Sequence, residues 1–155
     1  MKIGSTILFA SVFSVLLCCC SQVVYDTKGF VSREEFDRKF GWGLALPASA
    51  RQVRARVESR GTQQNTTYMA FPCDLNELDK TVQQWATDSS QSTAGAIHHF
   101  PLTNADYEGT GDAPIWWSPR NIQSGYYMKL PRAGGRGIRI WVDQARGISY
   151  LYDES

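Results

Sequence analysis

Strict alternation of apolar and polar residues near the C-terminus is the feature that most restricts the fold of this chain. The apolar positions of three successive segments are Tyr126, Met128 and Leu130, then Ile138, Ile140 and Val142, then Ile148, Tyr150 and Tyr152. A period of two residues is typical of a strand with one buried face. Glycine-containing turns at 131–137 and 144–147 separate the segments and suit antiparallel neighbours. The pattern therefore predicts a three-stranded meander.

Two further strands are predicted before it, over Arg51–Ser59 and Thr66–Phe71. Val53, Ala55 and Val57 alternate with polar residues that include Arg54 and Arg56. The arginine-rich face has two interpretations: a site for phosphate or anionic lipid, or an ordinary solvated face of the sheet.

Two helices are predicted from their first turns and their apolar positions. Ser32 and Glu35 form a capping box before a short helix over Arg33–Lys39, and Asp74 and Glu77 form another before a longer one. The longer helix, 75–86, carries an apolar stripe at helical spacing, made of Leu75, Leu78, Val82 and Trp85.

The first residues predict a leader rather than part of the domain. Lys2 precedes the apolar run Ile7–Leu17. A helix of that length rises roughly 16 Å, about half the hydrocarbon thickness of a bilayer. The run is therefore too short to span a membrane and has the length of the apolar region of a signal peptide.

The segment Leu16-Leu17-Cys18-Cys19-Cys20-Ser21 resembles the lipobox of bacterial lipoproteins. The resemblance implies that a cysteine receives a diacylglycerol and that the chain is cut before it. Cys20 fits best because it places Leu17 three residues upstream, and Cys19 is the second choice. In that family Asp after the lipidated cysteine retains the protein in the inner membrane. Ser21 here implies an anchor in the outer membrane, facing the periplasm. The alternative is an ordinary signal peptide and a secreted protein.

The predicted organisation is a signal peptide at 1–19, a tether at 20–30 and one domain at 31–155. The fold class is α+β: a mostly antiparallel five-stranded sheet, with the main helix on one face and the short N-terminal helix beside it. The residues expected in its core are Val53, Val57, Met69, Phe71, Leu75, Leu78, Val82, Trp85, Ile138, Ile140, Val142 and Tyr150.

Charge and cysteine content restrict the class of partner. Loss of Lys2 with the leader leaves fifteen basic and fifteen acidic side chains, which argues against a nucleic-acid-binding protein. Beyond the predicted anchor only Cys73 remains. We interpret it as a buried structural residue, and no disulfide can form within the mature chain.

The candidate site residues lie in the segment 87–124, which has no clear period. Trp116 and Trp117, flanked by Asp112 and Arg120, have the composition of an interaction hot spot. If the segment is extended, the two rings point in opposite directions, so one can enter the core while the other faces a partner. The alternative is that both rings are structural and fill the end of the sheet under the long loop. His98 and His99 are adjacent and lack companions at zinc spacing. We therefore expect no metal, no cofactor and no catalytic residue.

Three functions are compatible with these features. The first is a non-enzymatic binding module, attached to the membrane through its N-terminal lipid, with an unknown protein partner. The second is an immunity or inhibitor protein that acts in the envelope against a toxin or hydrolase. Its support is the excess of acids over 74–112 and of bases over 120–146. The third is a hydrolase that uses Asp112, His98 or His99.

Lipidation can be tested directly by labelling with palmitate. We expect wild-type protein and Cys19→Ser to incorporate label, and Cys20→Ser to lose it, because the thiol of Cys20 is the expected acceptor. Undiminished label on Cys20→Ser would contradict the choice of cysteine, and an unlabelled wild type would contradict lipidation.

Overall fold

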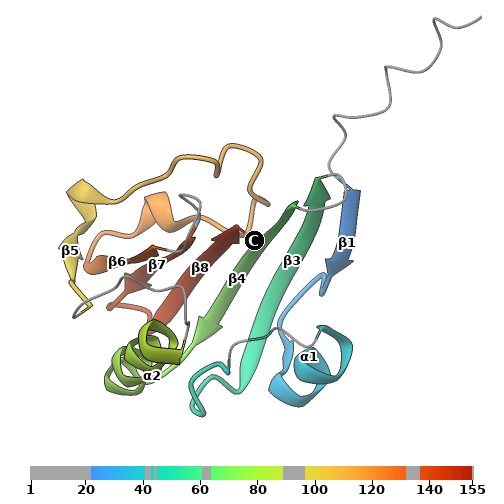
Figure 1. Cartoon of the computed structure of the whole chain (residues 1–155), viewed down its shortest axis with the longest axis horizontal. Coiled ribbons are helices and arrows are strands. Elements are labelled where there is room, and N and C mark those ends of the chain that lie inside the picture. Colours follow the sequence, from blue (N-terminus) through green and yellow to red (C-terminus); the bar gives the residue numbers. More distant parts are fainter. Residues whose placement is uncertain are drawn as a thin grey trace, which may run out of the picture.

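A computed structural model describes residues 22–40, 43, 45–60, 64–88, 97–131 and 137–154. The fold is α+β, as expected. One eight-stranded sheet forms its centre, with the strand order β1-β3-β4-β8-β7-β6-β5 and with β2 also paired to β3 (Figure 1). Every strand pair is antiparallel. The strands are β1 (Gln22–Asp26), β2 (Val31–Ser32), β3 (Gln52–Arg60), β4 (Gln64–Pro72), β5 (Phe100–Pro101), β6 (Gly125–Pro131), β7 (Gly137–Asp143) and β8 (Ile148–Glu154).

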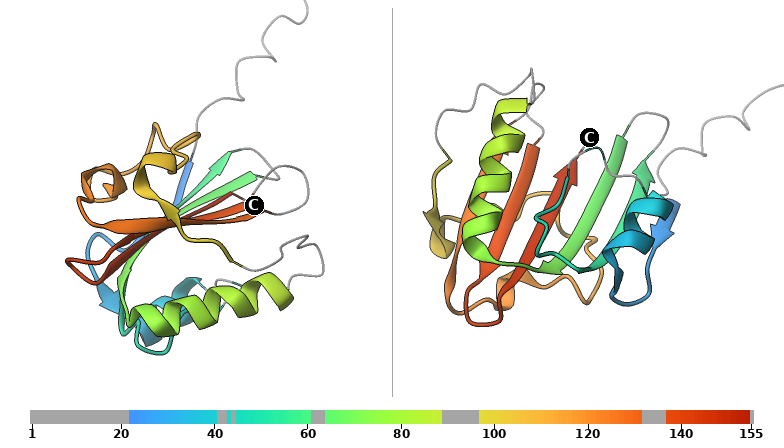
Figure 2. Two further views of the ribbon diagram at one scale, coloured as in Figure 1. Left: turned by 90° about the vertical axis from the view of Figure 1, so that its left-hand side faces the viewer. Right: turned by 90° about the horizontal axis from the view of Figure 1, so that it is seen from below.

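Both helices cover one face of the sheet, called here the inner face (Figure 2). They are α1 (Arg33–Phe40) and α2 (Leu75–Asp88). Leu78, Val82 and Trp85 of α2 pack in one apolar cluster with alternate residues of the strands. Of the predicted core residues all but Leu75 are buried, and Leu75 is partly buried against the same cluster. Tyr150 belongs instead to a second cluster on the opposite face of the sheet, and Val57 is buried outside both clusters.

That opposite, outer face is covered by residues 102–124, called here the covering loop, as Figure 2 shows. The loop contains two short 3₁₀ helices, at Leu102–Asn104 and Pro119–Asn121. A second buried cluster lies beneath it, made of Tyr68, Ala70, Trp117, Tyr127, Trp141, Tyr150 and Tyr152. The sheet is therefore buried on both faces, whereas the sequence indicated one covered face.

The prediction of five strands is wrong, because three short strands at or near the edges add to the five predicted. Strands β2 and β5 have only two residues each, too few to show any period. Gln22–Asp26, expected within the tether, pairs with β3 as strand β1. Its apolar residues Val23 and Val24 are exposed, and the register shifts between Val23 and Tyr25. No alternation marks such a strand in the sequence.

Each helix begins with a side-chain cap, but neither cap is the predicted reciprocal box. The amide of Glu35 donates to Ser32 Oγ at 3.2 Å, and that of Glu77 donates to Asp74 Oδ1 at 3.0 Å. The carboxylate of Glu77 does not return to its own helix start. It accepts bonds from the amides of Ala48 and Ser49, at 2.7 and 3.0 Å. Glu77 thus joins α2 to the loop that precedes β3.

The N-terminal leader and Cys18–Cys20 lie outside the described residues, so the structure leaves the lipidation expectation as it stands. Over the residues that are described, no helix is long and apolar enough to cross a membrane.

Tyr25 tests whether β1 belongs to the domain. Its ring stacks on Phe40 at 5.4 Å and meets the edge of Phe36 at 6.5 Å. We expect Tyr25→Ala to lower the free energy of unfolding by about 2 kcal/mol in urea melts, since it removes apolar burial and two ring contacts. The neighbouring Val24 is 64% exposed, so Val24→Ala should change stability by less than about 0.5 kcal/mol. If neither variant lowers the free energy of unfolding measurably, Gln22–Asp26 is part of the tether and not of the folded domain.

Candidate functional site

A tight turn in the covering loop brings the two predicted tryptophans into different surroundings. The amide of Trp117 donates to the carbonyl of Pro114 at 2.8 Å, so Ile115 and Trp116 are the central residues of the turn. The sequence suggested an extended segment at Trp116 and Trp117, but the structure has a turn there. The divergence of the two rings comes from the turn: Trp117 is 5% exposed, Trp116 is half-buried and Ile115 is 100% exposed.

Trp117 is the centre of the outer cluster. Its ring lies 5.1 Å from Trp141 and 5.4 Å from Tyr68, both edge-on. The rings of Tyr150 and Tyr152 also contact Trp117, with centroid distances of 6.4 and 6.3 Å. The indole Nε1 donates to the carbonyl of Leu151 at 3.1 Å. The polar end of the side chain is thus satisfied inside the cluster, as a buried indole requires.

Trp116 lies at the surface against β3. The guanidinium carbon of Arg54 sits 4.7 Å from the centroid of its ring, a cation–π contact. Arg54 was predicted on the outward face of its strand, and the structure places that face beside the covering loop. The contact holds Trp116 and Arg54 in one fixed arrangement next to the exposed Ile115.

A pocket of about 340 Å³ opens between these residues and the edge of the sheet. We call it the basic pocket; it is lined by Asp26, Lys28, Arg54, Arg56, Ala113, Pro114, Ile115 and Trp116. Arg56 Nη2 lies 2.6 Å from Glu58 Oε1, and Glu58 is buried. The Arg56 guanidinium is therefore held by a buried carboxylate that is not itself part of the pocket lining.

Lys28 enters the pocket from the segment after β1 and has an unusual backbone. Its φ is +60°, in the left-handed region that side chains other than Gly, Asn and Asp seldom adopt. Asp26 supports this geometry: its carboxylate accepts from the amide of Lys28 at 2.8 Å and from Nζ at 3.3 Å. Partial burial alone would raise the pKa of Asp26, but the bonds from Lys28 outweigh it and hold the pKa below its ordinary value. Asp26 thus stays ionised and keeps Lys28 at the rim.

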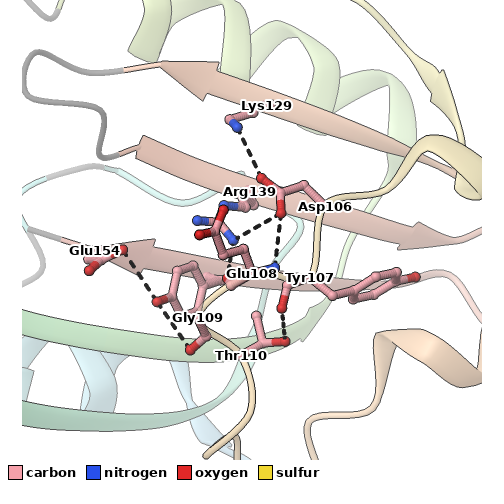
Figure 3. Close-up of polar contacts among 9 residues, drawn as sticks. Asp106, Tyr107, Glu108, Gly109, Thr110, Lys129, Arg139 and Glu154 are labelled. Atoms are coloured by element: carbon pink, nitrogen blue, oxygen red, sulfur yellow. Dashed lines mark hydrogen bonds and ion pairs between the residues drawn. The ribbon is translucent and has the colours of Figure 1, made fainter.

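An ionic network holds the covering loop to the strands beneath it (Figure 3). Asp106 lies 3.0 Å from Lys129 Nζ and 3.7 Å from Arg139 Nη1, and Arg139 also donates to the carbonyl of Glu108. Burial would raise the pKa of Asp106, but the Glu108 amide and the two cations lower it overall. Gly109 follows with φ +74°, and a Cβ there would lie 2.8 Å from Tyr152 Oη. Only glycine fits this close approach.

The other two predicted site residues do not join Trp116. Arg120 is exposed and stacks over Tyr107, with its guanidinium carbon 4.6 Å from the ring centroid. It lines a separate hollow of about 240 Å³ beyond Pro114 and Ile115. Asp112 is exposed on the loop and lines neither hollow. The predicted group of four is therefore split.

His99 lies on the other side of the sheet from Asp112, and no contact joins His98 to Asp112 in the described part of the chain. His99 stacks on Tyr126 at 4.1 Å, and its Nε2 lies 3.1 Å from Asp79 of α2. Tyr126 belongs to the inner cluster, whereas Asp112 is part of the covering loop over the outer face. His98 packs near Phe100 at 6.2 Å. The structure thus does not assemble the acid and the histidines of the hydrolase interpretation.

The described part of the chain also forms neither a metal site nor the surroundings that would activate a cysteine thiol. Its residues contain no group of three or more His, Cys, Asp or Glu side chains that could hold a metal ion. Cys73 is half-buried and contacts Ser149 Oγ at 3.5 Å. Burial raises the pKa of its thiol, and Asp74, Glu77 and Asp79 raise it further, which disfavours the nucleophilic thiolate.

Sequence reasoning missed Ile115 and Lys28 as members of the site. Ile115 stands beside Trp116 in the sequence, but nothing local shows that an isoleucine is wholly exposed. Lys28 was expected in the tether. Its one local signal is Asp26, two residues earlier, which can bond to the following backbone in a turn.

Comparisons with protein-family models, with curated proteins and with solved structures found no match to this chain.

The two tryptophans should differ sharply in their effect on stability. We expect Trp117→Ala to cost about 3–5 kcal/mol in urea melts, because it empties the centre of the outer cluster. Trp116→Ala should cost about 1 kcal/mol or less, the size of an exposed cation–π contact. If both variants lose several kcal/mol, Trp116 is structural and the surface-site interpretation is wrong.

Proposed function

We propose that this protein is a lipid-anchored, non-enzymatic binding module of the bacterial cell envelope, and that the turn at Ile115–Trp116 is its contact surface for a protein partner. The observation that carries the contact surface is the pairing of a wholly exposed Ile115 with a half-buried Trp116 fixed by Arg54. Trp and Arg dominate interaction hot spots.

Rigidity of the turn supports this proposal. The turn is closed by the Trp117 amide and anchored by the buried Trp117 ring. A surface held in its binding conformation loses little conformational freedom when a partner binds. An exposed isoleucine on such a rigid turn has no packing role in the chain itself, whereas contact with a partner would remove it from water.

The membrane part of the proposal comes from the leader. Lipidation at Cys20, or at Cys19 as the second choice, would attach the chain to the membrane, and Ser21 favours the outer membrane facing the periplasm. A secreted protein is the alternative if the leader is an ordinary signal peptide. The domain begins with β1 at Gln22, so little chain separates it from the proposed anchor, and the domain would lie close to the membrane surface.

An immunity or inhibitor protein is the second candidate. The same rigid turn favours it, since a preorganised loop with an exposed apolar residue can fill a pocket of its target with little change of shape. A toxin or hydrolase gene beside the gene for this chain would select this candidate over a general binding module.

Site-specific photo-crosslinking in cells tests the contact surface. A photoreactive residue at position 115 should give a discrete cross-linked product, and Trp116→Ala should abolish that product without lowering the melting temperature by more than a few degrees. The same probe at position 24, which is also apolar and exposed but lies on β1, is the matched control. No product at position 115, or an equal product at position 24, would contradict the proposal.

A further inference from the structure

The basic pocket has two walls of different chemistry. Lys28, Arg54 and Arg56 supply three cations from the edge of the sheet, and Asp26 is the one carboxylate among its lining residues. Residues 113–116 of the covering loop form the other wall, whose side chains are apolar apart from the indole N–H of Trp116. The volume of about 340 Å³ is at the lower end of the range for small-ligand sites.

The two arginines keep most of their hydrogen-bonding capacity. Arg54 donates one long bond, from Nη2 to the carbonyl of Lys28 at 3.4 Å, and Arg56 pairs with Glu58 through Nη2. Within the described part of the chain, the Nε atoms of both have no partner. A guanidinium has five N–H donors and no acceptor. Because these Nε atoms are buried, the donors that can face the pocket are the remaining N–H groups on the Nη atoms of the two side chains that line it.

Arg54 also lacks a countercharge in the described part of the chain, where its contacts are the Trp116 ring and the Lys28 carbonyl. Arg56 is matched by Glu58 and Lys28 by Asp26. The pair of Lys28 and Asp26 is weak, because the Lys28 side chain is 86% exposed and surface pairs contribute little. Lys28 Nζ is thus free to turn toward a ligand while the backbone bond to Asp26 is kept.

We propose that the basic pocket binds a phosphate group, with the organic part of its carrier against the apolar wall of residues 113–116. The cations come from two segments, Lys28 from the turn after β1 and the arginines from β3, so they approach from separate directions. A carboxylate is planar and is matched by one guanidinium fork, whereas a tetrahedral phosphate can present separate oxygens to several cations. This inference goes beyond the protein-binding role, which concerns the exposed side of the turn.

The indole resonances of the full chain provide a direct readout. The ¹⁵N-labelled protein, purified in a nonionic detergent, is titrated with inorganic phosphate and with phenyl phosphate at constant ionic strength. We expect the Trp116 indole signal to shift saturably, and phenyl phosphate to bind more tightly because its ring meets the apolar wall. The buried Trp117 indole, bonded to Leu151, serves as the internal reference and should not move.

Two variants remove cations from the pocket with different risks to folding. Lys28→Gly suits the left-handed backbone at this position, so it should leave the melting temperature unchanged or raised. Arg54→Gln removes the guanidinium. Each should weaken phosphate binding roughly tenfold or more, since each deletes a charged donor. Arg120→Gln, in the neighbouring hollow, is the matched control and should leave binding unchanged.

The results discriminate clearly. The inference is overturned if Trp116 shows no saturable shift with any of the phosphate probes, free or lipid, if acetate or chloride gives an equal shift, or if Arg120→Gln weakens binding equally. Mixed micelles doped with phosphatidylglycerol distinguish the source of the phosphate. A shift that needs Arg54 and occurs only with the lipid assigns a headgroup, and a shift with free phenyl phosphate assigns a soluble ester. Neither result depends on photo-crosslinking at position 115, so the two proposals can fail separately.

Discussion

The insertion of Trp117 among four aromatic rings is the contact on which the outer half of the molecule depends. Strands β4, β7 and β8 each present large rings on this face, and a sheet surface of that kind is stable only when it is covered. The covering loop has little regular structure with which to cover it. The buried indole with its satisfied Nε1, the stacking of Tyr107 on Trp141 and the ionic contact of Asp106 with Arg139 hold the loop on this face instead.

The burial of Trp117 also positions the residues beside it. Trp117 ends the turn that carries Ile115 and Trp116, so the exposed side chain and the half-buried ring inherit a fixed position from the buried one. The buried Trp117 and the exposed Ile115 therefore belong to one structural unit, the turn and its anchor. The core contact supplies the stability, and the turn that closes on it presents the surface proposed to bind a partner.

The basic pocket depends on the edge of the sheet. Strand β1 pairs with β3 and brings Asp26 beside Arg56, while Tyr25 points to the opposite face and packs on α1. The amide of Thr27 then donates to the carbonyl of Ala55 at 3.0 Å, which holds the turn that carries Lys28. Without β1 and the turn that follows it, the pocket would lose Asp26 and Lys28 from its lining, and the arginines of β3 would form an ordinary solvated face.

The sequence by itself determined the elements with strong local signals: the three alternating C-terminal strands, β3, β4, the apolar stripe of α2 and the cap residues Ser32 and Asp74. Their side-chain period and first-turn chemistry are local properties. Only the tertiary structure decided that Tyr150 faces away from Ile140, that Trp117 rather than Trp116 is buried, and that Lys28 meets Arg54. Alternation of apolar and polar residues indicates that a strand has two different faces, but it does not indicate which segment covers each face. Very short edge strands and loop turns acquire their position from distant partners, and no local pattern encodes those contacts.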